Sequence, residues 1–463
     1  MEIPMSSKPP RSVSAGFQAS SAKACEAKPS HGFLKAARAV LIIAAAALAV
    51  LIFVSDTDSL ITGRSCIIYP MGGSMVNYSA GFIRRGLFGE IMMLMNSAVQ
   101  PIVSIIILSA ASLGFILFIF LRKMIRLNAG FPFILAILFA PSLIMMQRDT
   151  NFLRTDGVLI ALNLAASCIL LHLLFRKRYK EQSFSGMLCI DAVILTILLV
   201  SALMHELSAS LLPPVMLLYF LYARKVRRVM HFLFAAVLLF IVYAVMMTQF
   251  KYSDPVVVAE SWSGVYSDTA SIRFNPGLVN VADRSYANQY LNMSVELIKK
   301  DGMTLFRNML ITVLWPVAVL MLSGISVFRS ASVRAVIIRL LLIASCLCPL
   351  GLSLVGIDFG RWFALSATNL AAYMLLIAHP AFRRRRKRFP RGFRRITGIF
   401  VKGCVIVTAA VLFGYRLDTS GYFFGPYLNY REQAKQIITN TSNLPRDMKP
   451  LLSREKVIQK SGC

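Results

Sequence analysis

The sequence predicts an all-α polytopic membrane protein with about eleven transmembrane helices, and three observations lead to this fold class. Of the 463 residues, 57% are hydrophobic and only 15% are charged. The apolar residues are grouped in runs of roughly 17 to 25, the length that an α-helix needs to cross a bilayer core. The segments between these runs alternate in charge. Runs such as 102–121 and 230–250 are apolar throughout, whereas strands of a membrane β-barrel would alternate apolar and polar residues over about ten positions.

The chain divides into a tail, a membrane domain and a second tail. Residues 1–38 are rich in Ser, Ala, Lys and Pro without apolar periodicity, which predicts a disordered cytoplasmic tail. The membrane domain is expected at 39–414, with long external loops at 55–99 and 251–306, and 415–463 is expected as an external tail. The expected transmembrane helices are, in order, 39–54, 100–121, 131–146, 157–175, 187–204, 207–222, 230–250, 307–328, 336–356, 363–380 and 396–414.

The formal charge of +29 is an orientation signal rather than a sign of nucleic-acid binding. The tail, alternate loops and the stretch 381–395 contain 29 of the 50 Lys and Arg but only three of the 21 acids. Basic loops of this kind stay in the cytoplasm. The N-terminus is therefore predicted to be cytoplasmic and, with an odd number of spans, the C-terminus external.

Charged residues at the external ends of the spans are the candidate functional groups, because a charge beside a membrane span is costly unless it has a role. Asp358 and Arg361 lie three residues apart between two apolar runs. His205 and Glu206 interrupt another apolar stretch, shortly before the helix-breaking pair Pro213-Pro214. Each group has a plainer explanation, namely that its charges pair with one another or contact lipid headgroups.

The candidate residues fall into two chemical classes. Carboxylates and imidazoles act as general bases, so the catalytic candidates are His205, Glu206 and Asp358. Arginines bind phosphate oxygens through two parallel hydrogen bonds. The substrate-binding candidates are Arg84, Arg85, Arg148, Asp149, Arg154, Arg361 and Trp362. The acids Asp56, Asp58 and Asp156 are expected at the same membrane face. A polyprenyl-linked sugar, with its phosphate and a hydroxyl to be activated, would use both classes.

These motifs resemble those of bacterial membrane proteins of surface-polysaccharide synthesis. Arg84-Arg85-Gly86 in the first long loop, the external His205-Glu206, and Asp358 followed by Gly360-Arg361-Trp362 are similar to O-antigen and exopolysaccharide repeat-unit polymerases and to GT-C-type glycosyltransferases. The resemblance covers roughly 39–414. It implies a helical bundle of that type, with a polyprenyl-linked sugar or glycan, membrane lipid and other polysaccharide-assembly proteins as partners.

The resemblance also implies individual roles. Arg84, Arg85 and Arg361 would bind the lipid-linked donor, and Asp56 or Asp58 would supply the acid of the first external loop. The chain has Asp-Thr-Asp there instead of the adjacent acidic pair of GT-C enzymes. No resident cofactor is expected, and the involvement of a divalent metal stays open.

Two other classes of protein fit part of the pattern. One is a transporter or flippase for a lipid-linked or anionic solute, although the sequence has no evident internal repeat of the kind common in transporters. The other is a structural or assembly protein. The eight cysteines form no zinc-binding pattern, and no P-loop, HExxH or Gly-x-Ser-x-Gly motif is present, which disfavours nucleotide hydrolysis, zinc proteolysis and serine-esterase chemistry.

Overall fold

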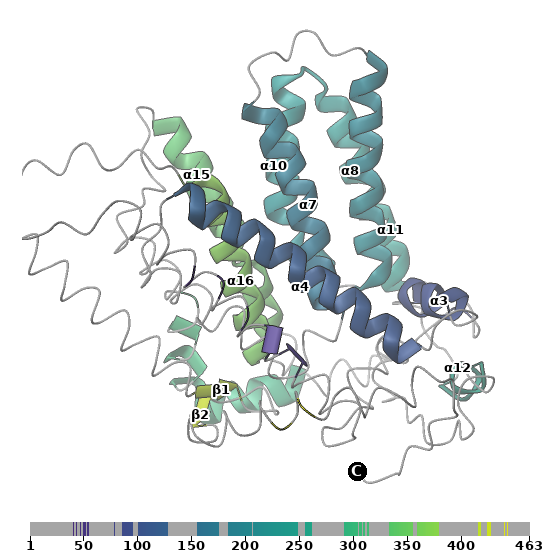
Figure 1. Cartoon of the computed structure of the whole chain (residues 1–463), viewed down its shortest axis with the longest axis vertical. Coiled ribbons are helices and arrows are strands. Elements are labelled where there is room, and N and C mark those ends of the chain that lie inside the picture. The colour runs from purple at the N-terminus through teal and green to yellow at the C-terminus, as the bar shows by residue number, and fades with distance from the viewer. Residues whose placement is uncertain are drawn as a thin grey trace, which may run out of the picture.

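The computed structural model of the chain is a bundle of helices (Figure 1). It describes residues 86–95, 101–127, 155–175, 184–205, 207–248, 255–261, 291–303, 333–354, 359–378, 415–417 and 424–426, with single residues at 40–54, 78, 305–313 and 439–442. The predicted spans 39–54, 131–146, 307–328 and 396–414 lie wholly or mainly outside these residues. Their existence therefore stays a prediction.

The described helices follow the predicted spans within a few residues. They are α3 (Gly86–Met95), α4 (Pro101–Arg126), α7 (Asp156–Phe175), α8 (Phe184–Met204), α9 (Ser208–Leu211), α10 (Pro213–Lys225), α11 (Val229–Thr248), α12 (Pro255–Glu260), α15 (Val333–Ser345), the 3-10 helix η4 (Cys348–Leu354) and α16 (Phe359–Ile377). Four stretches are long and apolar enough to cross a membrane, at Val103–Arg126, Asp156–Phe175, Val229–Met246 and Val333–Leu352. Leu188–Met204 is a shorter apolar helix.

Two predicted spans differ in detail from the structure. The stretch 207–222 is divided into α9 and α10, because Pro213 and Pro214 stand in the first turn of α10 and cannot donate backbone hydrogen bonds to the preceding turn. The stretch 336–356 is an α-helix that tightens into η4 after Cys348. The all-α expectation also has one small exception, since β1 (Tyr415–Leu417) pairs antiparallel with β2 (Phe424–Pro426) in the predicted external tail.

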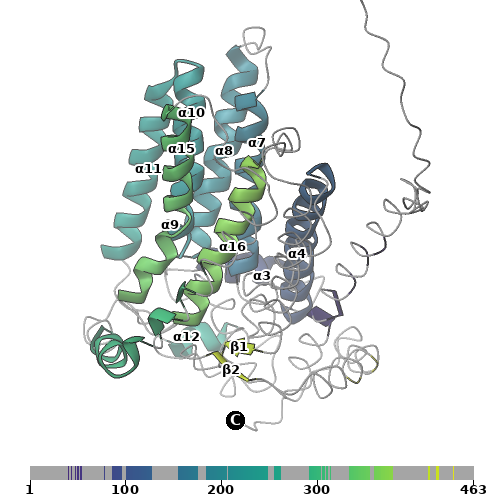
Figure 2. The same cartoon turned by 90° about the vertical axis from the view of Figure 1, so that its left-hand side faces the viewer.

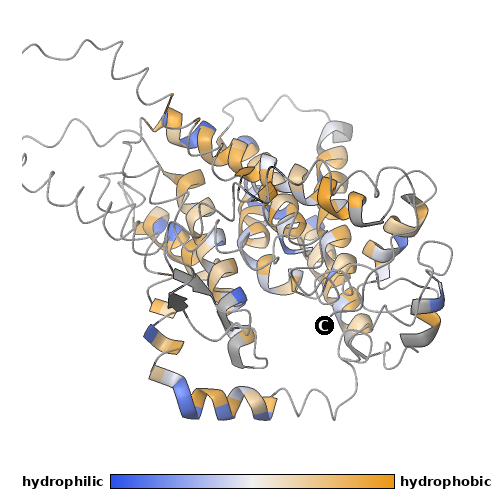
Figure 3. Cartoon of the chain, turned by 60° about the horizontal axis from the view of Figure 1, so that its bottom comes forward, coloured by the Kyte–Doolittle hydropathy of each residue, from blue (hydrophilic) through white to orange (hydrophobic). Residues whose placement is uncertain are grey.

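Helix α7 organises the packing of the bundle. It contacts α4, α8 and α10 most extensively and meets α9 and α16 as well. Figures 1 and 2 show α7, α8 and α10 side by side. The largest fully buried side chains include Phe120 of α4, Tyr219 and Tyr222 of α10, and Tyr373 of α16. Large hydrophobic side chains are also exposed on the outside of the helices, among them Phe118, Phe234 and Phe240, and most of the helical ribbon has a hydrophobic colour (Figure 3). An apolar exterior of this kind is what a bilayer solvates.

Polar contacts at helix ends establish which ends lie together. Lys225 at the end of α10 donates to the carbonyl of Leu174 at the end of α7, 2.7 Å away. Arg228, just before α11, pairs with Asp191 near the start of α8 at 3.3 Å. We call this the basic end of the bundle, defined by Arg122, Lys123 and Arg126 of α4 and Arg224, Lys225, Arg227 and Arg228. Lys123 also donates to the carbonyl of Leu376 near the end of α16, so the described basic segments lie at one end of the bundle. That this end faces the cytoplasm stays a prediction.

Candidate functional site

The end opposite the basic end contains a buried ion pair between two helix N-termini. Asp156 is the first residue of α7, and Arg361 lies in the first turn of α16. Arg361 donates from Nε to Asp156 Oδ2 and from Nη2 to Oδ1, both at 2.6 Å. The Asp156 side chain is completely buried and that of Arg361 is 14% exposed. The two helices are 205 residues apart in sequence at this point, and this contact joins them at one end of the bundle.

The position of Asp156 explains how its carboxylate can be stable although it is buried. The N-terminus of a helix carries partial positive charge from its unpaired N–H groups, which favours a carboxylate there. The bidentate guanidinium then neutralises the charge and occupies both carboxylate oxygens. From the sequence, Asp358 is a catalytic candidate, its pairing with Arg361 is only the plainer alternative, and Asp156 is expected only at the same membrane face. The signal that could have identified it is its place at the external start of an apolar span.

Trp362, predicted to bind substrate, is buried in the hydrophobic core at 8% exposure. It follows Arg361 on α16, in a stretch from Trp362 to Leu376 in which every residue is buried. This packing anchors the first turn of α16. A substrate contact for its indole ring stays a prediction.

His205 terminates α8 at the same end of the bundle. Its Nδ1 accepts a hydrogen bond from the backbone N–H of Leu207 at 3.0 Å, which stabilises the turn between α8 and α9. The neutral imidazole therefore carries its proton on Nε2 and is a hydrogen-bond donor there. In this geometry the ring can donate a hydrogen bond from Nε2 to a substrate oxygen, whereas taking a proton on Nδ1 would require the bond to Leu207 to break.

Helix α9 connects this turn with the neighbouring helices. Ser208 hydrogen-bonds through its hydroxyl to the hydroxyl of Tyr243 on α11, and α9 also contacts α7, α8 and η4. Because η4 in turn packs against α16, the segment that follows His205 is joined through α9 to α7, which begins at Asp156, and through η4 to α16, which carries Arg361. The predicted residues Arg84, Arg85, Arg148, Asp149, Arg154, Glu206 and Asp358 lie outside the described part of the chain, as do Asp56 and Asp58.

Helix α3 follows the predicted Arg84-Arg85-Gly86 motif and is too short to cross a membrane. Its ten residues span about 15 Å, half the thickness of a bilayer core. It packs on α4 and α8 at the end opposite the basic end (Figure 1). Glu90 accepts a hydrogen bond from the backbone N–H of Tyr78 at 3.2 Å. Burial, and secondly the charge of Glu90, raise the pKa of Tyr78 to about 12, so its phenol is neutral.

A row of polar side chains continues inward between α7 and α16. Ser167 and Tyr373 share a hydrogen bond of 2.5 Å between their hydroxyls. Asn163 and Asn369 stand one helical turn nearer the ion pair, each 1% exposed. Among the residues that the structure describes, both amides lack a hydrogen-bond partner. Polar groups inside an apolar bundle are costly, so their alignment with the Asp156–Arg361 pair points to a role for this seam.

No cluster of three or more His, Cys, Asp or Glu side chains able to hold a metal ion occurs within the described ranges. The described chemistry at this end consists of an ion pair, an imidazole and hydroxyl groups. Comparison with protein-family models, with curated proteins and with solved structures finds no match to this chain.

Proposed function

We propose that this protein transfers or polymerises polyprenyl-phosphate-linked sugars at the outer face of a bacterial inner membrane. The observation that carries the proposal is the buried, bidentate Asp156–Arg361 pair at the end of an apolar bundle opposite its basic end. Orientation does not require an arginine at this end, since basic residues accumulate on the cytoplasmic side. The pair needs another reason, and phosphate recognition at the membrane surface supplies one.

Asp156 would act by fixing the plane of the Arg361 guanidinium. An arginine whose fork is already oriented loses little conformational entropy when it binds phosphate oxygens. Its charge would stabilise the polyprenyl phosphate as it leaves with the electron pair of the broken sugar–oxygen bond. Burial strengthens such an interaction because the local dielectric is low.

The remaining step is activation of the acceptor hydroxyl. Glu206, which follows His205 in the sequence, would take the hydroxyl proton while the acceptor oxygen forms the new bond to the anomeric carbon. His205 would hold a substrate oxygen through Nε2–H, in keeping with its bond to Leu207. In this scheme Glu206 receives the proton and Arg361 stabilises the departing phosphate. Asp156 and His205 hold the guanidinium and the substrate in position.

The test is complementation of a deletion strain, with surface polysaccharide length and amount as the readout. Arg361→Lys keeps the charge but loses the planar fork, and it should shorten or abolish the polymer. Glu206→Gln should do the same. Arg224→Lys, at an exposed position of the basic end, is the matched control and should leave the polymer unchanged. Normal polymer from Arg361→Lys and Glu206→Gln at normal protein levels would refute the proposal.

A transporter for a lipid-linked or anionic solute is the second candidate, favoured by the unpartnered amides of Asn163 and Asn369. Transporters place polar groups in the bundle interior, at the depth that the solute must pass. Asn163→Leu and Asn369→Leu distinguish the two functions. Loss of solute uptake into proteoliposomes with these variants would support transport, whereas normal polymer synthesis in cells would support the transferase.

A further inference from the structure

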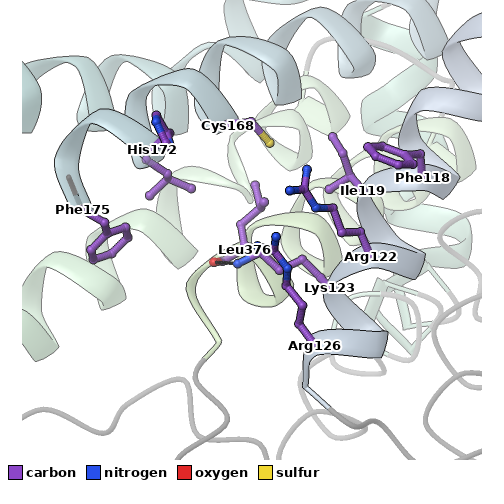
Figure 4. A pocket seen from close by; sticks show the side chains of 10 residues that line it. Phe118, Ile119, Arg122, Lys123, Arg126, Cys168, His172, Phe175 and Leu376 are labelled. Atoms are coloured by element: carbon purple, nitrogen blue, oxygen red, sulfur yellow. Dashed lines mark hydrogen bonds between the residues drawn. The ribbon is translucent and has the colours of Figure 1, made fainter. Parts of the chain in front are cut away.

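A second site lies at the basic end, far along α7 and α16 from the Asp156–Arg361 pair. It is a cavity of about 390 Å³ between the last turns of α4, α7 and α16, within the usual size range of ligand pockets (Figure 4). Arg122, Lys123 and Arg126 enter it from α4, and Cys168 and His172 line it from α7. None of its ten lining residues is an acid.

The three cations have different roles. Lys123 donates from Nζ to the carbonyl of Leu376 at 2.7 Å, so it caps the last turn of α16 and joins that helix to α4. Arg122 lies over the ring of Phe118, with the guanidinium carbon 5.8 Å from the ring centroid. Within the part of the chain that the structure describes, neither Arg122 nor Arg126 pairs with a carboxylate.

Membrane orientation alone does not explain why these cations border a cavity. Positive charge near a cytoplasmic helix end can be solvated anywhere on the surface. Here two like charges four residues apart, which repel each other on a helix, border a cavity whose rim is apolar. Phe118 is 56% and Phe175 71% exposed, and both border the cavity. Exposed aromatic rings next to cations are typical of the level of lipid headgroups.

We propose that this cavity binds the phosphate of an anionic phospholipid from the leaflet at the basic end, with the lipid chains leaving past Phe118 and Phe175. Arg122 and Arg126 contact the phosphate oxygens, and the Lys123 cap holds α4 and α16 at the right separation. Basic pockets between transmembrane helices on the cytoplasmic side recognise such headgroups. This site is independent of the sugar-transfer chemistry proposed above.

The experiment measures binding to the full-length protein in detergent micelles by the shift in its thermal unfolding temperature. The probes are phosphatidylglycerol, phosphatidylcholine and inorganic phosphate, each titrated into wild type and Arg122→Gln/Arg126→Gln. The control is Arg224→Gln/Arg227→Gln, which removes two exposed cations of the same end without touching the cavity. If the double variant fails to fold, each single substitution replaces it.

We expect phosphatidylglycerol, but neither phosphatidylcholine nor inorganic phosphate, to stabilise the wild type and the control. The cavity variant should bind phosphatidylglycerol about thirty-fold more weakly, since each basic side chain near a membrane surface contributes roughly five-fold in affinity. A single variant should lose about five-fold. Equal affinity in variant and wild type would overturn the site, and an equal effect of inorganic phosphate would overturn the assignment to a lipid.

Discussion

Removing the Arg361 side chain should destabilise the protein much more than removing both charges of its ion pair. Arg361→Ala leaves the Asp156 carboxylate, which is completely buried, without its bidentate partner. Breaking a buried pair in this way costs about 3–5 kcal/mol, because an uncompensated charge remains in a poorly solvated site. Because Arg361 is 14% exposed, water can partly solvate the site, and we expect a loss in the lower half of that range.

Asp156→Asn/Arg361→Gln removes both charges and keeps hydrogen-bonding groups of similar size. Replacing both members of a buried ion pair is often neutral, so we expect the double variant to lie within about 1 kcal/mol of the wild type. The coupling between the two sites should then amount to about 3 kcal/mol, the upper end of the range for residues in direct contact. The four proteins of this double-mutant cycle are the wild type, Asp156→Asn, Arg361→Gln and the double variant. Their free energies of unfolding in micelles can be measured by titration with a denaturing detergent.

The same cycle separates stability from activity. If the pair only holds α7 and α16 together, the double variant should fold and should also make normal polymer. If Arg361 binds phosphate, it should fold and make none. Additive effects of Asp156→Asn and Arg361→Gln would show that the two side chains do not interact, and the structural reasoning would then be refuted.

Substitutions at four further positions test other parts of the structure. A methyl group at Gly86 would overlap the ring of Tyr78, so Gly86→Ala should lower the free energy of unfolding by about 1–3 kcal/mol. Gly114→Ala is the control, because Gly114 has open space around it and the substitution should not lower stability. An equal loss of stability in both variants would contradict the overlap with Tyr78. Arg227 adopts a left-handed backbone conformation (φ 57°) after α10, which glycine tolerates better than other residues. Arg227→Gly should therefore raise the free energy of unfolding by about 1 kcal/mol. An equal gain from Arg227→Ala would show that backbone conformation is not the cause. Asp191→Asn should lower the stability by about 2 kcal/mol, because the carboxylate pairs with Arg228 and accepts a hydrogen bond from Tyr219. Thermal unfolding measures this loss, and an unchanged unfolding temperature would argue against a stabilising role for these contacts.

Much of the fold could be predicted from apolar run lengths. The helix α7 begins at Asp156, one residue before the predicted start of the span, and ends at the predicted Phe175. The buried Asp191 is likewise paired, since Arg228 and His231 both approach its carboxylate at 3.3 Å. Two general rules account for these features. Bilayer thickness fixes helix length, and the high cost of a buried charge restricts where charged residues occur.

The candidate site was predictable only in part, because pairing depends on which helices become neighbours. Arg361 was singled out by its chemistry, but Asp358, three residues away, was the obvious partner until α7 and α16 were placed side by side. Likewise, His205 is an evident candidate base from its residue type. Only the turn after α8 shows that its Nδ1 is engaged by the backbone of Leu207.

The sequence by itself determined that this chain forms apolar helices, where several of the described helices begin and end to within a few residues, and which helix ends are basic. These properties follow from local composition and from the free energy of placing each segment in hydrocarbon, which needs no knowledge of the other segments. Only the tertiary structure decided that Asp156 faces Arg361 and that a cavity opens beside Arg122 and Arg126. Those contacts join residues up to 253 positions apart, and their geometry depends on how neighbouring helices pack.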